Sequence, residues 1–384
     1  MAREKPRWRR VMNGRYLRWK ALVVLVRLVP ALQKRLAFFP RSVGMIEAAD
    51  VVLADTQTNL SKMFTEPEHQ LLTQLTAWDS TAPDFDLRTA AVTGQRAALY
   101  RNAWIDTKTS GVLLPERQAT MLPRGQYANW NAISARIDRK QVRIPGRVWT
   151  PLPTRSYYHF FIENGLRFME AIDLFGTMSV VVPPQLGRVE RNFWEAITAQ
   201  FPKISVRMVP VGSIVVADEV AYNFPASNNY EWQPIDPAHT ERMRQLFIGQ
   251  YGSPRNLDSR LYLSRGGAKL RQPTNGEELE ALLKGKNFTS FVADESNHRE
   301  QIDRFHSADT IIAVHGAGLT NLIFARPGTR VIEIFPENFI KSTYWWISRQ
   351  LGLHYTPLIG GPGNYDQHFA APLDALENLL DEID

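Results

Sequence analysis

The sequence predicts an α/β protein with parallel sheets in two doubly wound domains, preceded by a basic helical segment. The chain has 384 residues, which is more than one ordinary domain needs. Short apolar runs typical of buried strands alternate with stretches of helical length after residue 150. A polar stretch rich in Asn and Pro, 225–240, divides them into two series. Since strands that alternate with helices pair in parallel, we expect three parts: 1–45, 46–230 and 231–384.

The positive charge of the chain is concentrated at its N-terminus. Residues 1–35 hold eleven Lys or Arg against one acid, a net charge of +10, and the other 349 residues hold 34 basic and 38 acidic side chains, a net charge of −4. An enzyme that acts on nucleic acid carries its positive charge on the folded face that contacts phosphate. We therefore expect no nucleic acid among the partners.

An apolar run, 21–32, follows the first basic residues. It is shorter than the roughly 20 residues that cross a bilayer, and no small-residue cleavage site follows it. Trp8 and Trp19 among the basic residues favour contact between residues 1–40 and an anionic membrane surface. A tail with one docking helix is the alternative. The chain has no cysteine, which fits a reducing compartment, so we expect a cytoplasmic protein, peripheral on the inner face of the membrane.

The elements of the N-terminal domain follow from these patterns. Residues 45–90 are predicted to be helical and polar. Apolar runs separated by turn residues predict short strands over 90–150. The remaining expected elements are a helix over 154–176, a strand over 179–183, a helix over 191–201 and strands over 205–209 and 215–217.

The C-terminal domain shows a more regular alternation. The expected strands are 260–264, 288–293, 310–314 and 330–335. The expected helices are 238–251, 276–284, 297–307, 319–325, 341–351 and 373–382.

A glycine loop follows the fully apolar strand 310–314. Its sequence is His315-Gly316-Ala317-Gly318, and a short helix begins behind it. Two glycines let the backbone approach a ligand, and the amides at a helix N-terminus favour anions. The loop therefore predicts phosphate binding at the carboxyl edge of the sheet. A glycine turn that only packs helix on strand is the alternative.

Two side chains near the loop strengthen this prediction. His315 can donate to a phosphate oxygen, and Glu333, near the next strand end, can accept both ribose hydroxyls. A dehydrogenase is also consistent with this arrangement, because an acid about 20 residues after the glycines also marks a dinucleotide site. Asn321 stands at the third glycine position of that motif and argues against this alternative.

The run His315-Gly316-Ala317-Gly318-Leu319-Thr320-Asn321, with Glu333 and Pro336, resembles the signature of glycosyltransferase family 61. Upstream, Tyr262-Leu263-Ser264-Arg265, Gln301, and Tyr158-His159-Phe160 with Glu163 resemble further elements of that family in the same order. The chain departs from the family pattern after Arg271, where Glu277 is displaced by one residue.

The resemblance implies two facing Rossmann-like domains, the GT-B architecture, and a glycosyltransferase that inverts configuration without a metal. The implied co-substrate is a nucleotide-diphosphate sugar with a hexosyl, N-acetylhexosaminyl or pentosyl group, and no other cofactor is expected. The implied acceptor is a saccharide or glycolipid hydroxyl, in cell-surface polysaccharide biosynthesis. The predicted donor diphosphate site consists of Arg265, Arg271 and His315 to Leu319. Glu333 and Asn321 are expected at the ribose and nucleoside.

Four polar residues four apart, Arg155, His159, Glu163 and Arg167, form one stripe on the expected helix 154–176. His is the side chain best suited to take a proton from an acceptor hydroxyl at neutral pH. Glu163 either orients His159 or is itself the base. A surface row of salt bridges is the alternative reading.

Other assignments stay open at this point. Asp84-Phe85-Asp86 matches a manganese-binding triplet, but it follows a loop rather than an apolar strand, so no metal site is expected. A nucleotide-sugar epimerase or NAD-dependent dehydrogenase on a related fold is the alternative enzyme. A non-catalytic subunit that binds sugar nucleotides is the third hypothesis.

Overall fold

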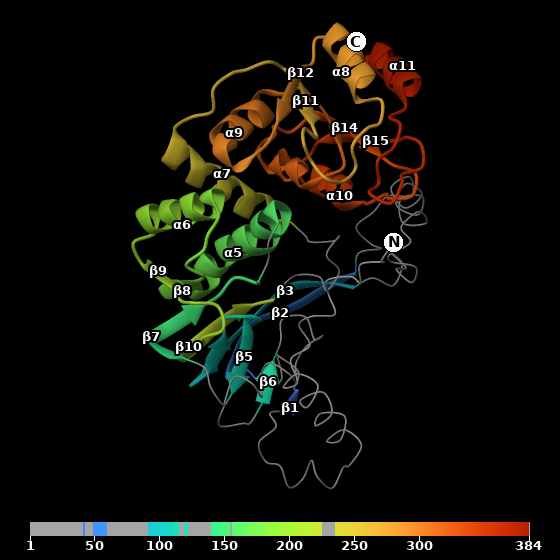
Figure 1. Ribbon diagram of the computed structural model, residues 1–384. Helices are drawn as coiled ribbons and strands as arrows, with labels where there is room; N and C mark the ends of the chain where they lie inside the picture. The colour runs from blue at the N-terminus through green and yellow to red at the C-terminus, as the bar shows by residue number, and fades with distance from the viewer. Residues whose placement is uncertain are drawn as a thin grey trace, which may run out of the picture.

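The structure is a computed structural model, and it describes residues 41–42, 49–59, 91–114, 119–121, 140–153, 156–224 and 235–383. Two β-sheets with helices between and above them make up this part of the chain (Figure 1). Strands and helices alternate after residue 150, which confirms the predicted α/β class.

The first sheet has 10 strands within the described ranges. The strands run in the order β1-β6-β5-β4-β10-β7-β8-β9, while β3 pairs with β10 and with β2. Their bounds are β1 (Arg41–Ser42), β2 (Val51–Asn59), β3 (Ala91–Arg101), β4 (Trp104–Asp106), β5 (Gly111–Leu114), β6 (Ala119–Met121), β7 (Gln141–Trp149), β8 (Met178–Val182), β9 (Ile204–Met208) and β10 (Ile214–Asn223).

This sheet is mixed, so the prediction of parallel sheets is only partly correct for it. Strands β7, β8, β9 and β10 form parallel pairs, and β1 pairs in parallel with β6. The other pairs, β2–β3, β3–β10, β10–β4, β4–β5 and β5–β6, are antiparallel. For the pair β4–β5 the physical reason lies in the connection, because the four residues 107–110 leave no room for the crossover that parallel pairing requires.

The second sheet is parallel throughout, with the strand order β12-β11-β13-β14-β15. Its strands are β11 (Arg260–Ser264), β12 (Thr289–Val292), β13 (Thr310–Val314), β14 (Arg330–Phe335) and β15 (His354–Ile359). The central strand β13 is buried along its whole length, as its fully apolar sequence predicts.

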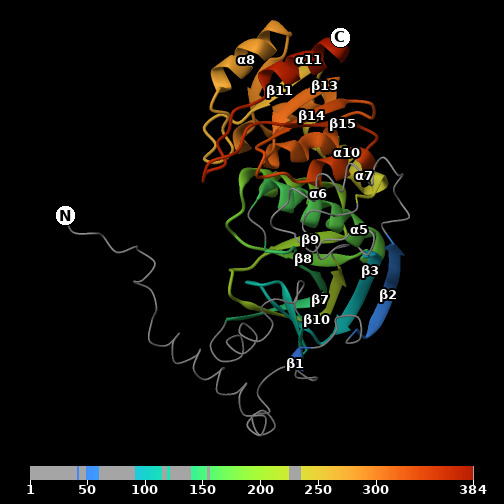
Figure 2. The same cartoon turned by 90° about the vertical axis from the view of Figure 1, so that its right-hand side faces the viewer.

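Helices fill the space between the two sheets. In both views, α5, α6 and α7 have the first sheet on one side and the second sheet on the other (Figures 1 and 2). This group consists of the π-helix η3 (His159–Gly165), α5 (Leu166–Phe175), α6 (Arg188–Gln200) and α7 (Pro237–Tyr251). The helices of the C-terminal part are α8 (Gly276–Gly285), η4 (Glu295–Asn297), α9 (His298–Ser307), η5 (Ala317–Phe324), α10 (Thr343–Gln350) and α11 (Leu373–Ile383).

One apolar core continues from the first helical layer into the second sheet. Phe161 of η3, Phe247 of α7 and Phe324 of η5 are buried, and their ring centroids lie 5.8–6.4 Å apart. Aromatic side chains of this size contribute most of the burial in a core. The two parts of the chain therefore pack through a dry aromatic cluster, which fixes η3 relative to the glycine loop.

The structure differs from the predicted elements in four places. The expected helix 45–90 is wrong where the structure describes it, because Val51–Asn59 is a strand. Strand β15 was not expected. The predicted helix 319–325 begins at Ala317 as a 3₁₀ helix, and the first part of the predicted helix 154–176 is a π-helix.

Several predictions lie outside the described residues, namely those on the segment 1–40, on Asp84-Phe85-Asp86 and on Arg155. The domain boundary at residue 230 stays a prediction. None of the helices that the structure describes is both long and apolar enough to cross a bilayer.

Candidate active site

The glycine loop lies at the carboxyl end of β13, between the ends of β11 and β14. Ala317 and Gly318 are the first residues of the 3₁₀ helix η5, a position where N–H groups lack an intrahelical acceptor. Leu319 donates its N–H to the carbonyl of Gly316 at 3.0 Å. Its amide therefore closes the turn, and the amides of Ala317 and Gly318 are the ones placed for a ligand.

Arg265 lies directly against the loop. A Cβ atom on Gly316 would come within 1.9 Å of Nη1 of Arg265, so only glycine leaves room for the guanidinium. Nη2 of Arg265 donates to the carbonyl of Leu270 at 2.7 Å. Its Nε is buried and has no hydrogen-bond partner in the structure. A buried donor without an acceptor costs free energy, so an acceptor at this position would stabilise the arrangement.

Arg271 holds the other side of the loop. Its Nε donates to the carbonyl of His315 at 3.0 Å, and its Nη1 donates to Oε1 of Gln367 at 2.8 Å. Its guanidinium carbon also lies 4.9 Å from the ring centre of Phe339. The backbone of Arg271 is left-handed, with φ of 57°, and its N–H bonds the carbonyl of Asp366 at 3.0 Å. No signal in the sequence predicted that Gln367 belongs to the site.

The two arginines have no counter-charge in direct contact. Among the ion pairs of the described residues, none includes Arg265 or Arg271. Burial, with a smaller repulsion from Arg271, lowers the pKa of Arg265 to about 10. Burial also lowers the pKa of Arg271. Two adjacent, partly desolvated cations favour an anion with more than one charge.

His315 and Glu333 form a buried pair beneath the arginines. Nδ1 of His315 lies 2.6 Å from Oε1 of Glu333, and the hydroxyl of Tyr355 donates to Oε2 of Glu333 at 2.6 Å. Glu333 is fully buried, and the ring of His315 stacks on Phe335 with centroids 5.3 Å apart. Both carboxylate oxygens are thus engaged inside the protein. The predicted ribose contact of Glu333 stays a prediction, and its visible role is to hold His315.

Electrostatics keep this imidazole neutral near neutral pH. Burial lowers the pKa of His315, and Arg271 and Arg265 lower it further, while Glu333 acts in the opposite direction. Burial, followed by the charge of Glu333, raises the pKa of Tyr355 well above 10. The arrangement therefore consists of a neutral tyrosine, a carboxylate and a neutral imidazole.

Asn321 connects the glycine loop with Tyr157, which lies shortly before η3 in the other part. Its Oδ1 accepts a hydrogen bond from the hydroxyl of Tyr157 at 2.6 Å. Its Nδ2 donates to Oε1 of Gln301 at 2.8 Å and to the carbonyl of Gly318 at 3.0 Å. Asn321 is fully buried, so these three bonds describe a positioning role. Its predicted contact with the nucleoside stays a prediction.

The predicted pair of His159 and Glu163 does come together on η3. Nδ1 of His159 lies 2.9 Å from Oε1 of Glu163, and one third of the His159 side chain is exposed while that of Glu163 is buried. Arg167 is buried as well and donates to the carbonyls of Thr150 and Asn223 at 3.1 and 2.7 Å. The alternative of a surface row of salt bridges is therefore wrong.

A series of aromatic rings leads from His159 to His315. The ring of Tyr158 lies 5.3 Å from that of His159 and 6.0 Å from that of Tyr344. The ring of Tyr344 lies 5.5 Å from that of His315. Two tyrosine rings, those of Tyr158 and Tyr344, therefore connect the two histidines.

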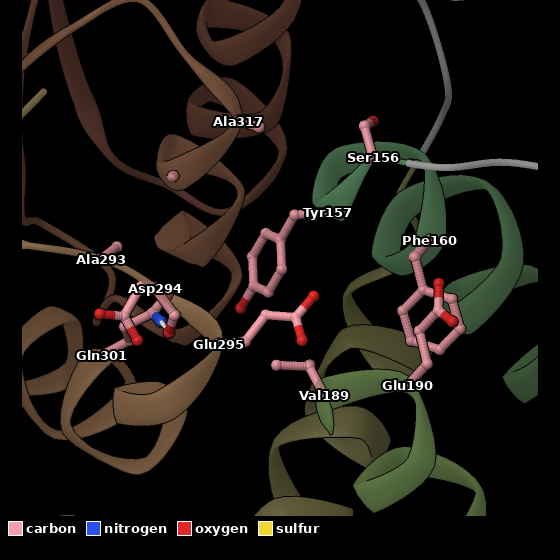
Figure 3. Close-up of a pocket in the computed structure, with 11 residues that line it drawn as sticks. Ser156, Tyr157, Phe160, Val189, Glu190, Ala293, Asp294, Glu295, Gln301 and Ala317 are labelled. Carbon is pink, nitrogen blue, oxygen red and sulfur yellow. Dashed lines mark hydrogen bonds between the residues drawn. The ribbon is translucent and has the colours of Figure 1, made fainter. Parts of the chain in front are cut away.

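A cavity of about 240 Å³ opens beside the loop, between η3 and α6 on one side and the second sheet on the other (Figure 3). Its polar lining includes three carboxylates, those of Glu190, Asp294 and Glu295, together with the amide of Gln301 and the hydroxyl of Ser156. Its floor contains Ala317 and Gly318. Burial, with a smaller contribution from Glu295, raises the pKa of Glu190. The cavity is therefore rich in hydrogen-bond acceptors, in contrast to the cationic side of the loop.

These features define an α/β protein with two partly buried arginines and a glycine loop at the carboxyl edge of a parallel sheet, and with a paired histidine and glutamate on η3. Residues 157–332 match the model of the family described as Glycosyltransferase 61. This match confirms, over residues 157–332, the resemblance to that family derived from the loop motif.

Two plant proteins are similar over shorter stretches. One is the beta-1,2-xylosyltransferase RCN11 of Oryza sativa subsp. japonica, 38% identical over 84 residues, which are 22% of this chain and 15% of the relative. The other is a beta-1,2-xylosyltransferase of Arabidopsis thaliana, 31% identical over 71 residues, which are 18% of this chain and 13% of the relative. The chain thus matches only a small fraction of the length of these relatives.

Proposed function

We propose that the protein is an inverting, metal-independent glycosyltransferase that takes its sugar from a nucleotide diphosphate. The observation that carries the proposal is the buried Nε of Arg265, without an acceptor, beside the second uncompensated cation, Arg271. A diphosphate supplies the missing acceptor and the missing negative charge together. The amides of Ala317 and Gly318 add two donors at the start of η5.

The same cations serve the departure of the nucleoside diphosphate. Negative charge grows on the leaving oxygen as the glycosidic bond breaks, and donors fixed in advance stabilise that charge at little reorganisation cost. Arg271 is fixed by Gln367 and the His315 carbonyl, and Arg265 by the Leu270 carbonyl. This is the task that a divalent cation has in other enzymes, and we propose that the protein needs none.

His159 is the proposed base that removes the proton from the acceptor hydroxyl. Glu163 lies 2.9 Å from its Nδ1 and is buried, so a negative charge next to the ring supports the imidazole as a base. Attack from the side opposite to the diphosphate inverts the anomeric carbon. The two facing sheets of the GT-B architecture would place the acceptor on η3 and the donor on the second sheet.

The cavity suits the hydroxyl-rich parts of the substrates. Carboxylates and amides accept hydrogen bonds from sugar hydroxyls, whereas the carboxylates repel phosphate. Its 240 Å³ is below the 300–1,000 Å³ that is usual for a whole drug-sized ligand, so it can hold one sugar ring. The names of the plant relatives make a pentosyl donor the first to test, ahead of hexosyl and N-acetylhexosaminyl donors.

The deciding experiment is a binding panel by calorimetry with UDP, GDP and NAD, followed by UDP-sugars. We expect a nucleoside diphosphate to bind and NAD not to bind. Arg265→Ala and Arg271→Ala should each weaken binding at least about tenfold, since each removes a charge-assisted contact of about 1.5–3 kcal/mol. Arg330→Ala is the matched control, because Arg330 is exposed at the opposite edge of the sheet. Unchanged affinity in both variants would refute the proposal, and NAD binding alone would favour a dehydrogenase.

A second measurement separates an enzyme from a non-catalytic binding subunit. His159→Ala should lower the transfer rate by about 10²–10⁴-fold while the affinity for the nucleoside diphosphate stays unchanged. His354→Ala is the control, as His354 is exposed at the start of β15. A donor hydrolysis rate that is absent in wild type, or unchanged in His159→Ala, would contradict catalysis by this residue. The anomeric configuration of the product, read by NMR, tests inversion.

We also propose that the basic segment 1–40 brings the enzyme to the inner membrane surface, where a saccharide or glycolipid acceptor of cell-surface polysaccharide synthesis would lie. The support is the net charge of +10 in residues 1–35 with Trp8 and Trp19. Co-sedimentation with anionic liposomes should be lost when residues 1–40 are deleted. Equal co-sedimentation of both forms would remove the idea without affecting the proposed chemistry.

A further inference from the structure

The proposed reaction does not use the Nε2 atom of His315. Nδ1 is engaged by Glu333, and the other oxygen of Glu333 is engaged by Tyr355. The ring is held between Phe335, Phe339 and Tyr344, with centroids 5.3–5.6 Å away. The ring therefore has one fixed orientation. No hydrogen bond to the described residues uses Nε2, and 11% of the side chain is exposed.

Nδ1 carries a hydrogen in this arrangement, because the neighbouring carboxylate can only accept. Nε2 of the neutral ring then has a lone pair and no proton. In this neutral form it can accept a hydrogen bond but cannot donate one to phosphate. It becomes a donor only if the ring takes up a second proton.

Charged and titratable groups from several parts of the chain surround the ring of His315. Glu333 of β14 favours the protonated ring, and Arg265 and Arg271, from the segment after β11, oppose it. Tyr355 of β15 and Tyr344 of α10 are neutral, because burial raises the pKa of both phenols. Lys341, before α10, lies with its ammonium 5.4 Å from the ring centre of Phe339 and adds a more distant positive charge. Two cations, Arg265 and Arg271, thus oppose the protonation of His315, and the carboxylate of Glu333 supports it.

A bound diphosphate reverses this balance. Its negative charges neutralise Arg265 and Arg271, which no longer oppose the proton, and they attract the proton directly. Glu333 remains at 2.6 Å to hold the imidazolium. Protonation therefore becomes favourable at the moment when a donor is needed beside the phosphate.

On the basis of the proposed function, we infer that binding of the nucleoside diphosphate places a proton on Nε2 of His315, and that this imidazolium acts as the acid for the leaving diphosphate. As the bond between the anomeric carbon and the phosphate oxygen breaks, its electron pair stays on that oxygen. The proton of Nε2 moves to the same oxygen, and His315 returns to the neutral form. The acceptor hydroxyl loses its own proton separately, and the product leaves as a protonated diphosphate.

The test is calorimetric titration of UDP and of GDP into the full-length protein at pH 7.5, in two buffers with different ionisation enthalpies. The difference in apparent enthalpy gives the number of protons taken up on binding. We expect wild type to take up about one proton more than His315→Gln, which serves as the baseline for the titration of the ligand itself. The affinity of wild type should rise by about tenfold for each unit of pH lowered, between the pKa of the complex and that of the free protein.

Two further variants separate this role from a structural one. Glu333→Gln should reduce proton uptake, because the charge that holds the imidazolium is gone. Tyr355→Phe keeps that charge and should preserve uptake. Circular dichroism and thermal melting verify that each variant is folded. Equal proton uptake in wild type and His315→Gln, with UDP or GDP bound to both, would overturn the inference and leave the proposed function intact. Failure of wild type to bind either nucleotide would instead refute the proposed function.

Discussion

The contact between Gly316 and the guanidinium of Arg265 can be tested by the substitution Gly316→Ala. The added Cβ would lie 1.9 Å from Nη1 of Arg265 and 3.1 Å from its Cζ, which is far inside van der Waals contact. The backbone of Gly316 is extended, with φ of 175° and ψ of 166°, so alanine meets no conformational penalty there. The whole effect must therefore come from displacement of the guanidinium.

The magnitude follows from what the displaced guanidinium loses. Arg265 would leave the carbonyl of Leu270, now at 2.7 Å, and the position from which its Nε faces the ligand. A hydrogen bond to a charged group is worth about 1.5–3 kcal/mol. The dissociation constant of the nucleoside diphosphate should therefore rise by roughly 10- to 150-fold. Thermal stability should change little, because the end of a long side chain can swing toward solvent.

Calorimetric titration of the nucleotide measures this change, and Gly267→Ala is the matched control. Gly267 lies in the segment that follows Arg265, and a Cβ atom there has open space around it. This control should bind as wild type does. If Gly316→Ala kept full affinity while its melting temperature matched wild type, then Arg265 would not contact the ligand from the position described, and the placement of the diphosphate would be wrong.

Four further predictions test other parts of the site. Tyr157→Phe leaves the buried Oδ1 of Asn321 without its donor at 2.6 Å and should lower the free energy of unfolding by about 1–3 kcal/mol, measured with urea. Arg271→Lys keeps the charge but cannot bond the His315 carbonyl and Gln367 together, so nucleotide affinity should still fall, which calorimetry measures. Burial lowers the pKa of His298 to about 4 from 6.5. The unfolded chain therefore binds more protons between these values, and stability should fall by about 2 kcal/mol from pH 7.5 to 5. His298→Phe should abolish that part of the pH dependence in urea denaturation. Finally, EDTA should leave the transfer rate unchanged, and recovery of a lost rate by manganese would contradict the metal-independent mechanism.

The strand pattern of the second sheet could be predicted because its signal is local. Strands β11, β13 and β14 begin and end at the residues expected from their apolar runs. Strand β15 was missed because Pro357 interrupts its pattern, and proline is tolerated there only because β15 is an edge strand. Strand β2 was missed because its residues are largely polar, and its pairing with β3 is not visible in its own sequence.

The contacts of the site could likewise be predicted from the sequence only where the signal is local. His159 and Glu163 were predicted as a pair from their spacing of four, and the helix brings them together. His315 and Glu333 follow adjacent parallel strands, so their proximity could be expected from the topology. The partner of Asn321 could not be predicted, because Tyr157 is 164 residues away and no spacing rule connects them. The same holds for Tyr355, which fixes the second oxygen of Glu333 from the unexpected strand.

These long-range contacts explain why the glycine loop has its present form. The loop needs small residues where Arg265 and Leu263 press against it, since a Cβ atom on Gly318 would lie 2.8 Å from Leu263. It also needs a polar residue at position 321, because Asn321 ties the loop to Tyr157 across the interface and to Gln301 beside the cavity. A dinucleotide motif has glycine at that position for close packing of helix on strand. In this protein the side-chain amide of Asn321 makes hydrogen bonds instead of that packing contact. Its bond with Tyr157 ties the short 3₁₀ helix η5 to the other part of the chain. The Tyr157–Asn321 hydrogen bond therefore couples the position of the glycine loop to the helix that carries His159.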